Sequence, residues 1–197
     1  MSTEGVIYRV AGPVVTATGI SPKMYDVVHV GKEQLMGEVI KIVGEYSIIQ
    51  VYEDTDNVKP GEPVTNTGKP LSVELGPGLL ESVYDGIQRP LPVLREKMRD
   101  FIFRGVAAPG LDHKKKWEFN PTVKKGDEVS EGMVIGTVQE GPILHKIMVP
   151  IGLNGKVDSI STGKFTIDET VAKIAGKEVC MMQYWPVRNP RPVAEKY

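Results

Sequence analysis

The histidines and one acidic stretch are the first candidates for metal binding or acid–base chemistry. His29, His113 and His145 are far apart, and no cysteine or second histidine stands near them at the spacing of zinc ligands. Residues 53–57 could suggest calcium, but they lack the glycine at loop position 6 and the final glutamate of an EF-hand. We therefore expect no metal site, histidines that are hydrogen-bonded or exposed, and a polar turn at residues 53–57.

Few residues could serve as nucleophiles. Cys180 is the only cysteine, and it lies in an apolar run, which predicts a buried and inert thiol. Asp112 and His113 could form a hydrolase triad with Ser130 or Ser161, but no G-x-S-x-G turn presents either serine. We therefore expect no catalytic residue in this chain.

A nucleotide site would need a glycine-rich phosphate loop, G-x-x-x-x-G-K-[ST], and the sequence contains none. Residues 126–130 read GDEVS, and Gly163-Lys164 is followed by Phe165, which offers no hydroxyl to a magnesium ion. The chain is therefore expected to hold no cofactor and to neither bind ATP tightly nor hydrolyse it.

One stretch suggests a different chemistry, that of a carrier protein. The pattern V-x-x-G-D-x-V-x-x-G-x-x-I-G-x-V at residues 123–138, followed by G-K-V at 155–157, is similar to biotinyl and lipoyl carrier domains. Such carriers hold their prosthetic group on a lysine at an exposed hairpin tip, and Lys146 is the only lysine near the corresponding place. A carrier domain with Lys146 as its attachment site is the alternative function. Fold similarity alone explains the pattern as well.

Charge and hydropathy restrict the partners. Lysine and arginine number 24 against 25 acidic residues, so the chain has no broad cationic field for nucleic acid. The basic run before Trp117, Lys114-Lys115-Lys116, is interpreted as a solvated loop. No apolar stretch approaches the ~20 residues of a membrane span, and the N-terminus lacks a signal-peptide pattern. These features predict a soluble, cytoplasmic chain that reaches a membrane only through partners.

The first 75 residues read as short β-strands separated by glycine, proline, asparagine or aspartate. Strands are expected at residues 4–11, 14–18, 26–30, 35–43, 47–52 and 71–75. Five or six short strands in this length predict a small closed barrel, because closure removes exposed strand edges.

After the barrel, two short helices are expected. Leu79, Leu80, Val83 and Tyr84 suggest about two helical turns that end at Gly86, and a second helical segment starts at Arg89-Pro90. From about Val106 the pattern becomes β again, with an Asn154-Gly155 hairpin signal. The expected second domain is an all-β sandwich or flattened barrel. Trp185 is expected to be a packing anchor where the chain leaves it.

Three stretches carry a family resemblance: LGPGLLESVYDGIQRPLPV at residues 75–93, KKWEFNPTVKKGDEVSEGMVIGTV at 115–138 and QYWPVRNPRPV at 183–193. On these residues the chain resembles the N-terminal portion of the catalytic A subunit of archaeal and vacuolar-type rotary ATPases. The phosphate loop of that family follows soon after the WPVR segment, so its ATP and magnesium ligands map onto no residue here.

The resemblance implies a domain order and a role. Residues 1–75 would be a β-barrel, 76–109 a helical connector, 110–184 the β-rich bulge domain, and 185–197 an exit segment toward a nucleotide-binding domain. The barrel would alternate with that of the B subunit in a hexameric crown around the central rotor, and the bulge would contact the peripheral stalk. The parent enzyme would couple ATP synthesis or hydrolysis to proton or sodium transport at the membrane, with this chain as scaffold.

Overall fold

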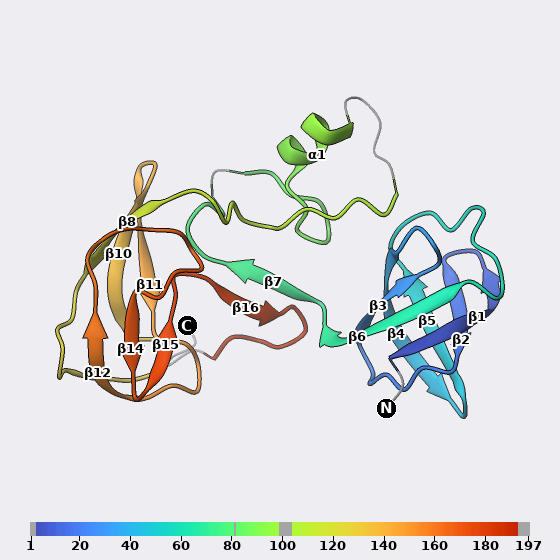
Figure 1. Cartoon of the computed structure of the whole chain (residues 1–197), viewed down its shortest axis with the longest axis horizontal. Coiled ribbons are helices and arrows are strands. Elements are labelled where there is room, and N and C mark those ends of the chain that lie inside the picture. The colour runs from blue at the N-terminus through green and yellow to red at the C-terminus, as the bar shows by residue number, and fades with distance from the viewer. Residues whose placement is uncertain (1–2, 81, 99–103, 193–197) are drawn as a thin grey trace, which may run out of the picture. The chain divides into compact units, whose positions relative to one another are not determined.

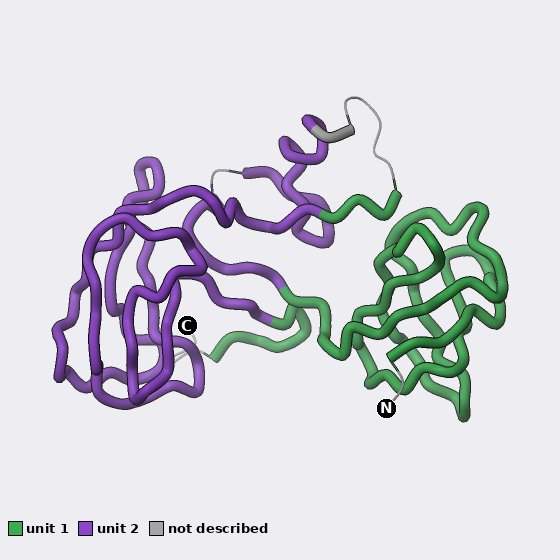
Figure 2. Tube along the Cα trace, in the orientation of Figure 1, with its two compact units in different colours: residues 1–72, 98–107, 186–197 green, residues 73–97, 108–185 purple. Residues whose placement is uncertain are grey.

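The structure is a computed structural model that describes residues 3–80, 82–98 and 104–192. Residues 81 and 99–103 of the expected connector and 193–197 of the expected exit segment lie outside the described residues. The chain folds into two compact units (Figure 2). Unit 1 comprises residues 1–72, 98–107 and 186–197, and unit 2 comprises residues 73–97 and 108–185.

Unit 1 is a closed β-barrel with the strand order β1-β2-β5-β4-β3-β6 (Figure 1). All neighbouring strands are antiparallel, and the pairing of β6 with β1 closes the barrel. The strands are β1 (Glu4–Ala11), β2 (Val14–Thr18), β3 (Asp26–Val30), β4 (Leu35–Val43), β5 (Tyr46–Val51) and β6 (Pro63–Pro70).

The alternation of side chains along the strands builds the barrel core. In β1, Ile7 is buried while Val6 and Tyr8 face outward, and a bulge follows Ile7 in the pairing with β2. Eleven buried apolar residues of the barrel form one cluster: Ile7, Val15, Ala17, Ile20, Val28, Val30, Leu35, Val39, Ile49, Val51 and Val64.

The expected barrel is confirmed, but its sixth strand is not the expected one. That strand is β6, whereas residues 72–75 form β7 (Ser72–Leu75), which pairs with β16 (Gln183–Pro186) in a separate two-stranded sheet. The sequence of β6, PVTNTGKP, is polar with proline at both ends, and Val64 is its only buried apolar residue. Because this strand contributes so little to the core, its sequence has almost none of the hydrophobic alternation that predicts a strand.

The expected helix at residues 79–84 is wrong. Residues 79, 80 and 82–84 are not helical, Tyr84 forms an isolated β-bridge with Pro90, and the Leu91 N–H donates to the Val83 carbonyl at 2.8 Å. The carboxylate of Asp85 accepts the backbone N–H groups of Ile87 and Arg89, so a side chain organises this turn. The second expected helix is confirmed as α1 (Leu91–Met98).

Unit 2 is built around two four-stranded sheets, which confirms the expected second all-β sandwich. One sheet has the order β11-β10-β8-β13, formed by β11 (Ile143–Met148), β10 (Val134–Glu140), β8 (Trp117–Pro121) and β13 (Gly163–Phe165). The other has the order β15-β14-β12-β9, formed by β15 (Lys177–Val179), β14 (Ala172–Ile174), β12 (Gly155–Ile160) and β9 (Glu128–Val129).

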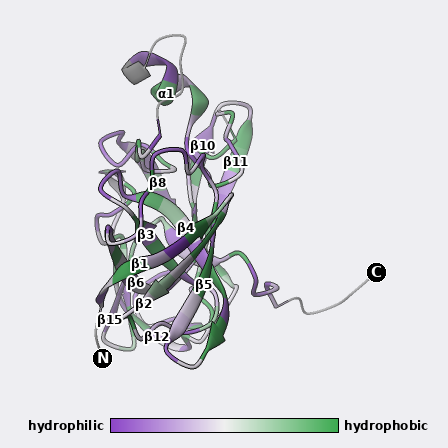
Figure 3. Cartoon of the chain, turned by 90° about the vertical axis from the view of Figure 1, so that its right-hand side faces the viewer, coloured by the Kyte–Doolittle hydropathy of each residue, from purple (hydrophilic) through white to green (hydrophobic). Residues whose placement is uncertain are grey.

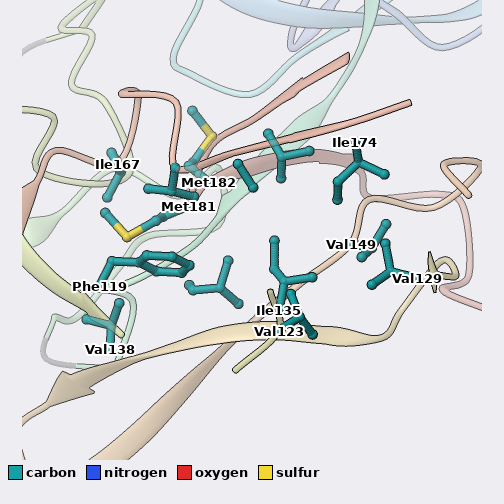
Figure 4. Packing of buried hydrophobic residues seen from close by; sticks show 14 of the residues in the cluster. Phe119, Val123, Val129, Ile135, Val138, Val149, Ile167, Ile174, Met181 and Met182 are labelled. Atoms are coloured by element: carbon teal, nitrogen blue, oxygen red, sulfur yellow. The ribbon is translucent and has the colours of Figure 1, made fainter. Parts of the chain in front are cut away.

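The core of unit 2 is one cluster of buried residues from both sheets, and it is mostly aliphatic, with Phe119 among its members (Figure 4). Asn154-Gly155 does not form the expected hairpin. The turn lies at Ile151-Gly152, and β12 pairs with β9 and β14 rather than with β11. The hairpin signal failed because it reports a local turn, whereas the chain here crosses from one sheet to the other.

No helix among the described residues is long and apolar enough to cross a bilayer. The domain limits inferred from the sequence stay a prediction.

We predict that limited proteolysis of the chain releases a fragment that ends between residues 76 and 105. In this connector α1 is the only described helix, and exposed irregular chain is where proteases cut. Mass spectrometry of the fragments measures the cleavage site. A single cooperative unfolding transition, with no cleavage in this region under any mild condition, would contradict the division into two domains.

Candidate functional site

The sequence candidates for metal binding are not brought together. Within the described part of the chain, no group of three or more histidine, cysteine, aspartate or glutamate side chains could hold a metal ion. His29 Nδ1 lies 3.4 Å from the Gln34 carbonyl oxygen. Asp54 accepts the Asp56 N–H at 3.0 Å, which confirms the polar turn, and Arg104 donates to the carbonyls of both residues.

The side chains considered for a nucleophilic site likewise make hydrogen bonds that stabilise the fold. Cys180 is only half-buried rather than buried, and its thiol donates to the Met182 carbonyl at 3.0 Å. Both ring nitrogens of His113 face carboxylates, so the imidazole has no free nitrogen for a serine of a triad. Trp185 is half-buried in β16.

Lys146 does not occupy a hairpin tip. It lies in the middle of β11 and is paired with Thr137 of β10, while residues 141–142 make the tip between these strands. A swinging prosthetic group needs an exposed lysine on a turn, so the carrier interpretation is not supported.

The middle lysine of the basic run, Lys115, packs against Trp117. The Lys115 ammonium lies 4.0 Å from the centre of the Trp117 ring, a cation–π contact. Trp117 itself is buried, and its indole nitrogen has no hydrogen-bond partner within the described residues. Both side chains line a cavity of about 390 Å³ in unit 2, together with Pro77, Tyr84 and His113.

Three glutamates are buried in the described part of the chain, and the sequence analysis did not identify them. Glu140, at the end of β10, is 1% exposed. One carboxylate oxygen, Oε1, accepts the backbone N–H groups of Gly78 and Leu80 at 2.9 Å each. The other, Oε2, lies 2.8 Å from Nδ1 of His145. Glu140 therefore fixes the Gly-Pro-Gly segment on the sandwich of unit 2.

Glu74 in β7 is the second, and it is 9% exposed. Its carboxylate accepts the Leu111 N–H at 2.8 Å and the Tyr184 hydroxyl at 3.3 Å, and it lies 3.3 Å from Nε2 of His113. Its backbone is paired by the Gln88 side chain, which accepts from the Glu74 N–H and donates to its carbonyl, both at 2.7 Å. Burial, followed by the Glu74 charge, raises the pKa of Tyr184.

The third, Glu38, belongs to the barrel and is 2% exposed. Arg188 donates two hydrogen bonds to its carboxylate, from Nε to Oε1 at 2.9 Å and from Nη2 to Oε2. The Tyr52 hydroxyl donates to Oε2 at 3.1 Å. The guanidinium also lies 4.3 Å from the centre of the Tyr25 ring. The hydrogen bond to Glu38 raises the pKa of Arg188, and the two residues form a bidentate ion pair within unit 1.

Strand alternation was the available signal for one of these glutamates. Glu140 follows Val138 by two residues in VIGTVQE, so it falls on the buried face of β10. Glu38 alternates with the barrel-core residues Leu35 and Val39, so the same rule places it on the outer face of β4, although it is buried. Their partners are 5 to 150 residues away along the chain, and no local pattern identifies them.

The outside of the barrel carries an apolar face. We define this outer face by Val6, Tyr8, Val43 and Tyr46, all exposed, with Tyr8 58% exposed. Strand pairing joins them in the row Val6, Thr18, Tyr46 and Val43, and the Tyr8 and Tyr46 ring centres are 4.9 Å apart. Figure 3 shows hydrophobic and hydrophilic residues mixed along the barrel strands. Ile40 and Ile42 of β4 are also exposed.

Comparisons with known proteins agree with these two folds. The profile "ATP synthase alpha/beta family, beta-barrel domain" matches residues 7–68, which lie in the barrel. The profile "ATPsynthase alpha/beta subunit barrel-sandwich domain" matches residues 108–188, which contain the sandwich.

Relatives with curated names match nearly the whole chain. The A subunit of the A-type ATP synthase of Methanoculleus marisnigri is 64% identical over 195 residues, 98% of this chain and 33% of the relative. The corresponding A subunit of Methanospirillum hungatei is 65% identical over 98% of the chain and 34% of the relative. The A subunit of Natronomonas pharaonis is 57% identical over 100% of the chain and 34% of the relative.

The chain thus spans about a third of the length of these relatives. The barrel fold, the sandwich fold and a sequence identity above 50% over nearly the whole chain all support one assignment. The chain belongs to the family of A-type ATP synthase A subunits and corresponds to their β-barrel and barrel-sandwich region.

Proposed function

We propose that this chain is the N-terminal scaffold and interaction region of the A subunit in a proton- or sodium-translocating A-type ATP synthase. The observation that carries the proposal is the identity of 57–65% to such A subunits over nearly all 197 residues. In this role the chain shapes and connects the enzyme, and the chemistry of ATP belongs to the rest of the polypeptide. Its place would be peripheral to the cell membrane, on the cytoplasmic side.

The barrel would meet the equivalent barrel of the B subunit in an alternating hexameric ring around the central rotor. The outer face supports this, since it exposes two tyrosines and tyrosine is enriched at protein–protein interfaces. Four side chains make a small patch, which fits a contact below ~1,200 Å² that depends on the other domains for strength. The sandwich of unit 2 would be the part that contacts the peripheral-stalk subunits.

A domain exchange tests the proposal. This chain replaces the matching third of the Methanoculleus marisnigri A subunit, and the hybrid is expressed with that organism's B subunit. We expect the hybrid to assemble with the B subunit and to hydrolyse Mg-ATP. A hybrid that is folded but does not associate with the B subunit, while the unaltered relative does, would overturn the proposal.

Within that hybrid, Tyr8→Glu should weaken association with the B subunit about tenfold, because it places a charge in the outer face. The matched control is Lys59→Glu, an exposed barrel residue outside that face. If analytical ultracentrifugation shows that the two variants associate equally with the B subunit, the outer face is not part of the interface.

The chain by itself is expected not to bind ATP. Phosphate-binding loops use backbone N–H groups and a lysine around the phosphates, and the sequence offers no such loop. Calorimetric titration of the chain with Mg-ATP should give no stoichiometric heat. A one-to-one micromolar site would show that the scaffold interpretation omits a nucleotide site.

A further inference from the structure

His113 is held between two carboxylates that come from distant parts of unit 2. Its Nδ1 lies 2.7 Å from Oδ2 of Asp168, and its Nε2 lies 3.3 Å from Oε2 of Glu74. Glu74 is nearly buried in β7, whereas the Asp168 side chain is 49% exposed in the loop between β13 and β14. The imidazole therefore bridges β7 and that loop.

The protonation state of the ring decides whether both contacts are attractive. A neutral imidazole has one N–H donor, so its second nitrogen would turn a lone pair toward a carboxylate oxygen. An imidazolium donates from both nitrogens, and each hydrogen bond to a carboxylate is then charge-assisted. The geometry with a carboxylate at each nitrogen is therefore the geometry of the cation.

The same cluster fixes the loop that carries His113. The Leu111 N–H donates to Oε2 of Glu74, the oxygen that His113 also faces. Asp112, in the same loop, accepts the backbone N–H groups of Lys114 and Lys115 and so holds the loop's own turn. Tyr184 of β16 donates to the other oxygen of Glu74.

We propose that His113 is a proton-dependent latch, which in its cationic form fastens residues 108–115 to β7 and to the loop that carries Asp168. When the ring loses its proton, one of the two bridges becomes repulsive and the loop is released. Because His113, Leu111 and Lys115 line the cavity of unit 2, the latch also sets the shape of one cavity wall.

The expected pH dependence follows from the cluster. The hydrogen bond to Asp168 raises the pKa of His113 above its ordinary value, burial opposes this, and the charge of Glu74 adds to the rise. A raised folded-state pKa means that the latch contributes fully below about pH 6.5, the unfolded value. Its contribution is lost as the pH rises through the raised pKa of the folded state.

NMR titration of the His113 ring is the first test. We expect a pKa above ~6.5 in the chain, and a lower pKa in Asp168→Asn, which removes one charge at an exposed position and keeps the side-chain shape. His145→Gln is the matched control, since that histidine contacts Glu140 and not this cluster. A His113 pKa at or below ~6.5, or one that Asp168→Asn does not change, would overturn the proposal.

Hydrogen exchange of the Leu111 amide is the second test, because that N–H is bonded inside the cluster. Its protection, corrected for the intrinsic rate, should fall as pH passes the His113 pKa, roughly tenfold for each unit by which that pKa exceeds 6.5. His113→Gln should remove this pH dependence. Protection that is constant across the titration, or equally pH-dependent in His113→Gln, would overturn the latch. Should that variant fail to fold, the smaller fall expected in Asp168→Asn decides.

Discussion

Replacing Glu140 with alanine is expected to lower the free energy of unfolding of unit 2 by about 3–5 kcal/mol. The side chain is essentially inaccessible to water and accepts the N–H groups of Gly78 and Leu80 while it contacts His145. Each buried N–H that loses its acceptor costs about 1–3 kcal/mol, and the removed side chain leaves a cavity.

Glutamine at position 140 separates the hydrogen bonds from the charge. Its amide oxygen can still accept both backbone N–H groups, while the side chain no longer carries a charge. We expect Glu140→Gln to retain most of the stability that Glu140→Ala loses. Glu128→Ala, an exposed glutamate of β9, is the control and should change stability by no more than ~0.5 kcal/mol.

Urea unfolding followed by tryptophan fluorescence measures this change for unit 2 alone, because the two tryptophans of the chain, Trp117 and Trp185, belong to that unit. A loss below ~1 kcal/mol in Glu140→Ala would show that water replaces the carboxylate as acceptor. Glu140 would then not fix the Gly-Pro-Gly segment.

How far the sequence predicts the fold depends on whether the information is local. β1 to β4 are found with their observed limits, since alternating apolar residues between glycine, proline and aspartate specify short strands directly. Leu79, Leu80, Val83 and Tyr84 have helical spacing, but none of these four residues is in a helix. The N–H groups of Gly78 and Leu80 are bonded instead to Glu140, some 60 residues later in the chain.

The polar centres at Glu74 and Glu38 were unpredictable for the same reason. The cluster at Glu74 joins residues 74, 111, 113, 168 and 184, and Glu38 meets Arg188 across 150 residues. Each of these side chains alone reads as an ordinary surface residue. Only the paired strands β7 and β16, which the sequence did not predict as a sheet, bring residues 74 and 184 together.

The second large effect is expected from Gly136→Ala. Position 136 lies in β10 at a bulge, and a Cβ there would come within 2.2 and 2.3 Å of two ring carbons of Phe119 and 3.0 Å from the Asn120 carbonyl oxygen. Phe119 is fully buried among the aliphatic side chains of the core (Figure 4), so its ring cannot move without displacing them. We expect a loss of about 3 kcal/mol in the stability of unit 2, the upper part of the usual range for overpacking.

A double-mutant cycle identifies the clash as the cause. Phe119→Leu removes the ring atoms that the new methyl group meets, so the double variant Gly136→Ala/Phe119→Leu should lose less stability than the sum of the single variants. Gly86→Ala is the control, because a Cβ there has no neighbour within 4 Å and its φ is not in the left-handed region. It should be neutral or slightly stabilising. If the two core changes were simply additive in urea unfolding, the ring of Phe119 would not be what requires glycine at position 136, and contact with the β8 backbone at Asn120 would be the cause instead.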